Sequence, residues 1–220
     1  MSWIETSAKR GKKLQDSYNI NGVPVFMKDK LPDNLDFSFV VKYIERRIMP
    51  RLMKGIDIIY IGQFEDFKRR NINAYFEDGA LYISNVQDDE MDIIDDIVHE
   101  VAHAVEKEYG GYIYTGKIER EFRAKRRRLY DMLQSYGYKI SPVFKVRMEY
   151  DKDIDEFLYK EIGYEVLENL VNGLFSSPYA TTSLREYFAT GFEEYFIGDG
   201  SYLKKVSPAV YNTIESLMEE

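Results

Sequence analysis

Residues 88–111 read DDEMDIIDDIVHEVAHAVEKEYGG, a stretch that contains both histidines of the chain. Its apolar residues recur three and four positions apart, which is the spacing of one face of an α-helix. The acidic residues at its start complement the positive end of a helix dipole, and Gly110 and Gly111 are expected to end the helix. We therefore predict a helix from about residue 88 to residue 110, with one face buried.

The predicted helix carries the motif HEVAH at residues 99–103. Histidines four positions apart lie on one helix face with Cβ atoms about 6 Å apart, so His99 and His103 can bind the same ion. Glu100 would lie beside that ion and take a proton from a bound water, whose pKa zinc lowers to about 7. The motif predicts one Zn²⁺ held by the two histidines, with Glu100 as general base. The alternative is a pair of hydrogen-bonded histidines on a half-buried helix face.

The third ligand of this zinc site must be a carboxylate, because the sequence has only these two histidines and no cysteine. The same count excludes a di-iron site, which needs a second Glu/His pair. Glu106 is one turn beyond His103, so its carboxylate is poorly placed to reach back to the metal. A role as a partner of the ligand His103 suits Glu106 better than a role as ligand. Glu186, in a later helical stretch with small neighbours, is the better ligand candidate, although it could also be a solvated helix charge. Asp95 and Asp96 either orient a ligand or complement the helix dipole.

The HEVAH motif, followed by Tyr179 and then by Glu186 within Glu-Tyr-Phe-Ala, resembles the anthrax-lethal-factor-like metallopeptidases, which are gluzincins. The resemblance covers about residues 55–200. It implies that Glu186 is the third zinc ligand and that Tyr179 donates its hydroxyl to the oxyanion formed when water attacks a peptide carbonyl. Residues 190–192 read Thr-Gly-Phe, where the family usually has Glu-Ala-Phe. From the sequence, Tyr179 could also be a loop tyrosine that packs on the core.

The order of elements predicts an α+β, zincin-like fold, in which a small mixed sheet with a hairpin packs on the HExxH helix and a mostly helical C-terminal part follows. Residues 1–30 are expected to form a flexible arm, and residues 31–220 a single metallopeptidase domain. Asp33 or Asn34 would cap a first helix, and Glu77-Asp78-Gly79 predicts the hairpin turn. A strand is expected over 55–62, and further helices at 116–136, 151–174, 183–197 and 207–219.

The composition excludes some partners and compartments. A net charge of −8 and a pI of about 5.0 argue against nucleic-acid binding. The basic run at residues 125–128 is expected to be a solvated helix face, with a local partner patch as the alternative. No apolar stretch suits a signal peptide or a membrane span, so we expect no membrane association and a cytoplasmic or intracellular location. A virion component and a toxin exported without a classical signal are the other options.

The leading functional hypothesis is a zinc metalloendopeptidase that hydrolyses a protein or peptide substrate. Ala80–Ser84 is expected to be an edge strand that pairs with extended substrate. The alternative is a structural or assembly protein, such as a virion ring or tail component, that keeps the fold and the zinc. In either case the N-terminal arm could bind a protein partner or form an oligomer. A toxin-like effector protease with a single host target would use the same zinc-dependent hydrolysis as the metalloendopeptidase and would differ only in its partner.

Overall fold

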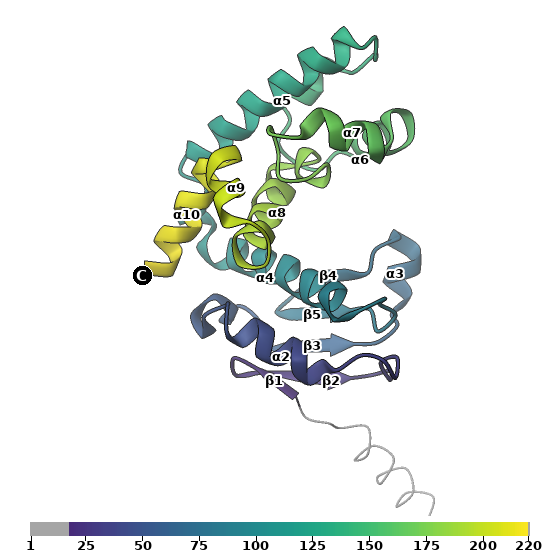
Figure 1. The fold of residues 1–220 in the computed structure, drawn as a ribbon, viewed down its shortest axis with the longest axis vertical. Helices are drawn as coiled ribbons and strands as arrows, with labels where there is room; N and C mark the ends of the chain where they lie inside the picture. The colour runs from purple at the N-terminus through teal and green to yellow at the C-terminus, as the bar shows by residue number, and fades with distance from the viewer. Residues whose placement is uncertain (1–17, 220) are drawn as a thin grey trace, which may run out of the picture. The chain divides into compact units, whose positions relative to one another are not determined.

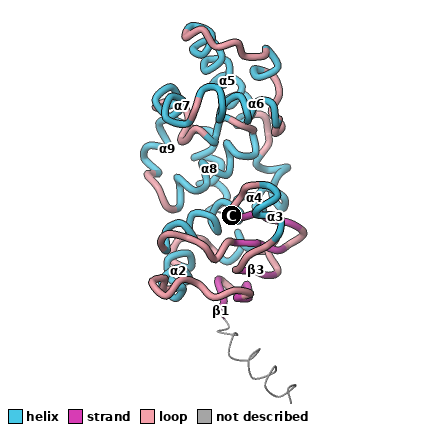
Figure 2. The backbone as a smooth tube through the Cα atoms, turned by 90° about the vertical axis from the view of Figure 1, so that its right-hand side faces the viewer, coloured by secondary structure: helices cyan, strands magenta, loops and turns pink. Residues whose placement is uncertain are grey.

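The computed structural model describes residues 18–219 (Figure 1). The chain divides into two compact units between Glu108 and Tyr109, and helix α4 (Glu90–Ile113) contributes residues to both. All strands in the described residues belong to the first unit, whereas the second is built of helices (Figure 2). The prediction of an α+β fold with a helical C-terminal part is confirmed. None of the helices described has the length and apolar character that crossing a membrane needs.

The first unit is built on one five-stranded mixed sheet with the strand order β1-β2-β3-β5-β4. Neighbouring strands β2, β3 and β5 are parallel, while β1 and β4 pair antiparallel at the two edges. Residues that face one side of the sheet, such as Ile59, Ile61 and Leu81, are completely buried. The strands are β1 (Tyr18–Ile20), β2 (Val23–Met27), β3 (Ile58–Ile61), β4 (Ala74–Glu77) and β5 (Ala80–Ile83).

The predicted hairpin is formed by β4 and β5. Its turn residues Asp78 and Gly79 both have positive φ, 47° and 84°, as a two-residue turn between twisted strands requires. The hairpin lies against α4, because Lys107 Nζ is 5.4 Å from the ring centroid of Phe76. The prediction that the hairpin packs on the motif helix is therefore confirmed.

Strands β1 and β2 fall within the segment 1–30 that the sequence assigns to an arm. They are joined by a turn at Asn21 and Gly22, which have positive φ, and their residues Ile20, Val23 and Val25 are buried. Three and five residues are too few to show a clear alternation, so neither strand was predicted. The part of the predicted arm at residues 1–17 lies outside the described residues.

The remaining helices of the first unit begin later than predicted or were missed. Helix α2 (Phe37–Glu45) is capped by Asp36, whose side chain accepts a hydrogen bond of 2.9 Å from Ser38 N, and not by Asp33 or Asn34. A 3-10 helix η1 (Pro50–Met53) and helix α3 (Glu65–Arg70) follow. Six residues are too few to show a helical period, so α3 was not predicted.

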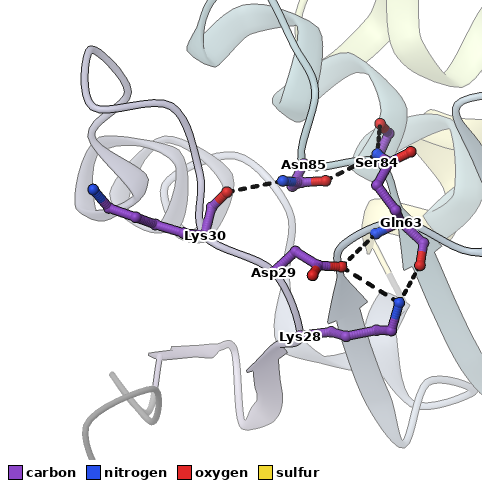
Figure 3. A network of polar contacts seen from close by, with 6 residues as sticks. All are labelled: Lys28, Asp29, Lys30, Gln63, Ser84 and Asn85. Atoms are coloured by element: carbon purple, nitrogen blue, oxygen red, sulfur yellow. Dashed lines mark hydrogen bonds and ion pairs between the residues drawn. The ribbon is translucent and has the colours of Figure 1, made fainter.

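A polar network ties together the loops that follow β2, β3 and β5 (Figure 3). Gln63 is central: its backbone N–H donates to Asp29 Oδ2 (2.8 Å), and its side-chain amide donates to Asn85 Oδ1 (2.9 Å). Asn85 in turn donates to the Lys30 carbonyl (2.8 Å). Because the three strands are parallel, their carboxyl ends lie side by side at the same end of the sheet. The network therefore holds the loop that leads from β5 into α4.

The second unit contains the predicted helices, with several differences. The stretch 151–174 is divided because Gly163 adopts a positive φ of 82°, the short helix α9 was missed, and α4 continues through both glycines to Ile113. Helix α4 ends at Ile113, and Gly116, where φ is 92°, directly precedes the next helix. The elements are α5 (Lys117–Ser135), η2 (Pro142–Lys145), α6 (Lys152–Glu156), the π-helical η3 (Phe157–Ile162), α7 (Tyr164–Val171), η4 (Tyr179–Thr181), α8 (Leu184–Phe196), α9 (Gly200–Val206) and α10 (Pro208–Glu219).

The basic run on α5 is only half solvated, so the prediction of a solvated face is wrong for Lys125 and Arg126. Lys125 Nζ donates to Ser207 Oγ (2.7 Å), and Arg126 Nη1 donates to the Arg147 carbonyl (2.6 Å). Both side chains lie on the buried face of α5, at helical spacing from Phe122. The helical period placed these two residues toward the core, whereas residues 127 and 128 are exposed.

Helices α8 and α10 approach each other closely at Gly191. A Cβ atom at this position would lie 2.5 Å from Val210 Cγ1 and 3.6 Å from Leu203 Cδ1. The distance to Val210 is shorter than real Cβ atoms show, whereas the distance to Leu203 is an ordinary van der Waals contact. Both neighbours are completely buried. The glycine in the Thr-Gly-Phe sequence is therefore required by the packing of α10 on α8.

Candidate metal centre

The candidate metal centre lies on α4, where His99, Glu100 and His103 come together. One ligand atom of each side chain lies within 4.8 Å of those of the other two. The two imidazole rings are nearly perpendicular, with centroids 4.9 Å apart and planes at 84°. Glu100 and His103 are each 6% exposed and His99 is half-buried. Two imidazoles and a carboxylate in this arrangement could hold a metal ion, and nitrogen and oxygen donors suit zinc.

Helix α4 is held rigidly because its apolar residues are buried almost completely. Its first turn is capped by Asp89, whose carboxylate accepts from Met91 N (2.7 Å). Glu90 accepts from Asp36 N (2.9 Å), which joins α4 to the start of α2. The residues of α4 with an exposed fraction of 1% or less are Ile93, Ile94, Ile97, Val98, Val101, Ala102, Ala104, Val105 and Ile113.

Glu106 lies beside His103, as the sequence suggested. Its Oε2 is 3.4 Å from His103 Nδ1, and both side chains are largely buried. A carboxylate next to one ring nitrogen fixes the orientation of an imidazole and leaves the other nitrogen, Nε2, available as a ligand atom. The contact supports a positioning role for Glu106 rather than a role as ligand.

Asp96 is bonded to the loop before α4. Its Oδ2 accepts a hydrogen bond of 2.5 Å from Gln87 Nε2. Burial raises the pKa of Asp96 to about 7; the Gln87 hydrogen bond opposes this effect, and the charges of Asp95 and Glu100 add to it.

An acidic cavity of about 390 Å³ adjoins Asp96 at the start of α4. It is lined by Asn73, Val86, Gln87, Asp88, Asp92, Asp95 and Asp96. The carboxyl groups of Asp88, Asp92 and Asp95 give this side of α4 a negative field that favours cations, and Asp96 adds to this field only in part near pH 7.

Tyr179 and Glu186 belong to the second unit, whereas the two histidines belong to the first. Tyr179 opens η4 and is 36% exposed. Glu186 lies in the first turn of α8 and is half-buried. Its place as third ligand, and the place of Tyr179 as oxyanion donor, stay predictions.

The start of α8 is held by residues that the sequence interpretation did not single out. Ser183 Oγ caps the helix by accepting from Glu186 N (3.1 Å), and the Met148 carbonyl accepts from Leu184 N (2.7 Å). The Met148 segment is itself held by Arg126, which donates to the neighbouring carbonyl of Arg147. A Ser-x-x-Glu pattern is typical of a helix N-terminus, so the cap could have been predicted. The Met148 contact carries no signal in the sequence.

The prediction that Ala80–Ser84 is an edge strand is wrong. Strand β5 pairs with β3 on one side and with β4 on the other, so its backbone groups are already bonded. The edge of the sheet next to β5 is formed by β4. The hairpin signal could not reveal which of its two strands would face inward, because that depends on pairing with β3.

Comparison with known protein families gave a match. The model of the family described as "Anthrax toxin lethal factor, N- and C-terminal domain" matches residues 79–217. This range begins at Gly79 of the hairpin turn and includes β5, α4 with both histidines, and almost all of the second unit. No curated protein and no solved structure matches the chain.

Proposed function

The chain belongs to the anthrax toxin lethal factor family, and from this premise we propose that it is a zinc-dependent metallopeptidase. The observation that carries the proposal is the cluster of His99, Glu100 and His103, whose ligand atoms lie within 4.8 Å of one another. The two imidazole donors suit zinc, with Glu100 beside them as base, and Glu106 next to His103 Nδ1 leaves Nε2 to bind the metal. The resemblance to the lethal-factor-like peptidases adds Glu186 as third ligand.

In the proposed reaction each residue has one task. The two histidines and Glu186 would hold a zinc ion, which would supply a Lewis acid and lower the pKa of water. Glu100 takes the proton from the attacking water and passes it to the leaving amine. The Tyr179 hydroxyl donates to the oxyanion that develops on the peptide carbonyl. The low exposure of Glu100 strengthens its electrostatic interactions, because little water surrounds it.

We propose a protein or peptide as substrate, bound in an extended conformation along the outer edge of β4. An edge strand presents unpaired backbone groups on one side, and an added strand can satisfy them. Strand β4 takes the place that the sequence interpretation gave to residues 80–84, because β5 is paired on both sides.

The Glu100→Gln variant tests the mechanism. The amide keeps the shape of the side chain but cannot act as a base, so the variant should retain one zinc per chain and lose cleavage of a fluorescent peptide library. Zinc is measured by plasma mass spectrometry on the purified protein. Glu108→Gln, an exposed change on the same helix, is the matched control and should cleave normally. A Glu100→Gln protein that cleaves like wild type would falsify the mechanism.

The His103→Ala variant tests the metal site itself. Loss of one ligand should reduce bound zinc well below one equivalent. Native mass spectrometry then separates the peptidase from an assembly protein. A chain that cleaves peptides without forming a ring supports the peptidase, whereas a stable zinc-containing ring without cleavage supports assembly.

A further inference from the structure

Positive charge is concentrated in one short part of this acidic chain. Residues 117–147 contain ten Lys or Arg and three Asp or Glu, a net charge of +7. Because the whole chain has a net charge of −8, the remainder carries −15. Such an asymmetry produces a local field opposite in sign to that of the rest of the molecule.

The exposed charges of this segment form a stripe along α5. Arg120, Arg123 and Arg127 are spaced three and four positions apart, so they lie on one helix face, and all three are exposed. Within residues 18–219 no salt bridge involves any of them. The same spacing continues to Tyr130 and Gln134, so the stripe runs about 21 Å along the helix.

A groove of about 650 Å³ lies at the end of this stripe. Tyr130 and Gln134 line it together with Tyr138 and Ile140 from the segment after α5. Its rim is cationic, because Lys139 also lines it. The stripe and the groove therefore form one surface, with positive charge along α5 and, at its end, a recess that is lined by both polar and apolar side chains, Ile140 and Pro142 among the apolar ones.

We propose that this surface, the α5 stripe with its groove, is a docking site for an acidic segment of a partner protein that carries an apolar side chain. The acidic residues would lie along the arginines, and the apolar side chain would enter the groove. The proposal is independent of peptidase activity, because none of the docking residues belongs to the metal centre.

Charge complementarity favours an acidic peptide over other polyanions. Tyr130 is 5% exposed, and Lys145 Nζ lies 4.1 Å from its ring centroid, so this ring offers no open face on which a nucleic-acid base could stack. A long nucleic acid or an anionic membrane would also meet the −15 carried by the remainder of the chain. A short acidic segment meets chiefly the local field, because salt screens charges beyond about 8 Å.

Fluorescence anisotropy with a labelled peptide of six glutamates on either side of one phenylalanine tests the proposal on the full chain. We expect saturable binding that weakens with added salt and weakens when the phenylalanine is replaced by serine. Replacing Arg120 and Arg127 together by glutamate should weaken binding by about tenfold or more. The matched control, Lys54→Glu with Lys68→Glu, makes the same change in net charge at exposed positions of the first unit and should change affinity by less than about twofold.

Circular dichroism shows whether the double variant is folded, and Arg127→Gln serves as a milder second variant that should weaken binding in the same direction. Equal affinity of wild type and both stripe variants would overturn the proposal. So would tighter, stripe-dependent binding of a single-stranded RNA oligonucleotide or of phosphatidylserine vesicles.

Discussion

Replacing Gly191 by alanine tests whether the contact between α8 and α10 decides the residue at this position. In an exposed helix the change would stabilise the protein by about 1 kcal/mol, because alanine favours the helix. Here the new methyl group would lie 2.5 Å from Val210 Cγ1, where carbon atoms in contact are about 3.5–4.0 Å apart. Val210 is completely buried and its branched side chain has few alternative rotamers, so it cannot move aside freely.

Overpacking of this kind typically costs about 1–3 kcal/mol. Set against the gain in helix propensity, it predicts that Gly191→Ala lowers the free energy of unfolding by up to about 2 kcal/mol. Urea unfolding followed by circular dichroism measures the change. Val210→Ala removes the methyl groups that clash, so in the double variant the alanine at 191 should be at least about 1 kcal/mol less destabilising than in the wild-type background. A Gly191→Ala protein more stable than wild type would show that the close approach is absent.

Three further predictions concern the metal centre and the second unit. Glu106→Gln should weaken zinc binding by about 10- to 100-fold, although both ligand histidines stay in place. Competition with a chelating dye measures the affinity, and an unchanged affinity would mean that Glu106 does not position His103. Ser183→Ala should lower the free energy of unfolding by about 1 kcal/mol in urea titrations, because Glu186 N loses its cap; no change would mean that the cap contributes nothing. Burial lowers the pKa of Lys125 to about 8, below the value of about 10.4 in the unfolded chain. Between about pH 8 and about pH 10.4 the unfolded state therefore binds more protons than the folded state, so stability increases with pH in this range. The free energy of unfolding of wild type, relative to that of Lys125→Met, should rise by about 1 kcal/mol between pH 7 and pH 9. A difference that is flat or falls over that range would contradict the buried, charged lysine.

The sequence by itself determined the features that depend on neighbours along the chain. The spacing of apolar residues predicts α4, and the helix geometry then brings His99 and His103 together without any tertiary contact. The turn at Asp78 and Gly79 follows in the same way, because both residues tolerate positive φ. These interactions span at most a few residues, so local patterns are sufficient to predict them.

Only the tertiary structure decided the features that depend on residues far apart in the chain. Pairing with β3 places β5 inside the sheet, and packing of α10 requires glycine at position 191. Contacts with Ser207 and the Arg147 carbonyl bury two members of a run that charge alone marks as solvated. A side chain's own chemistry does not specify which distant group will cover it, because burial and strand order arise from the packing of whole elements.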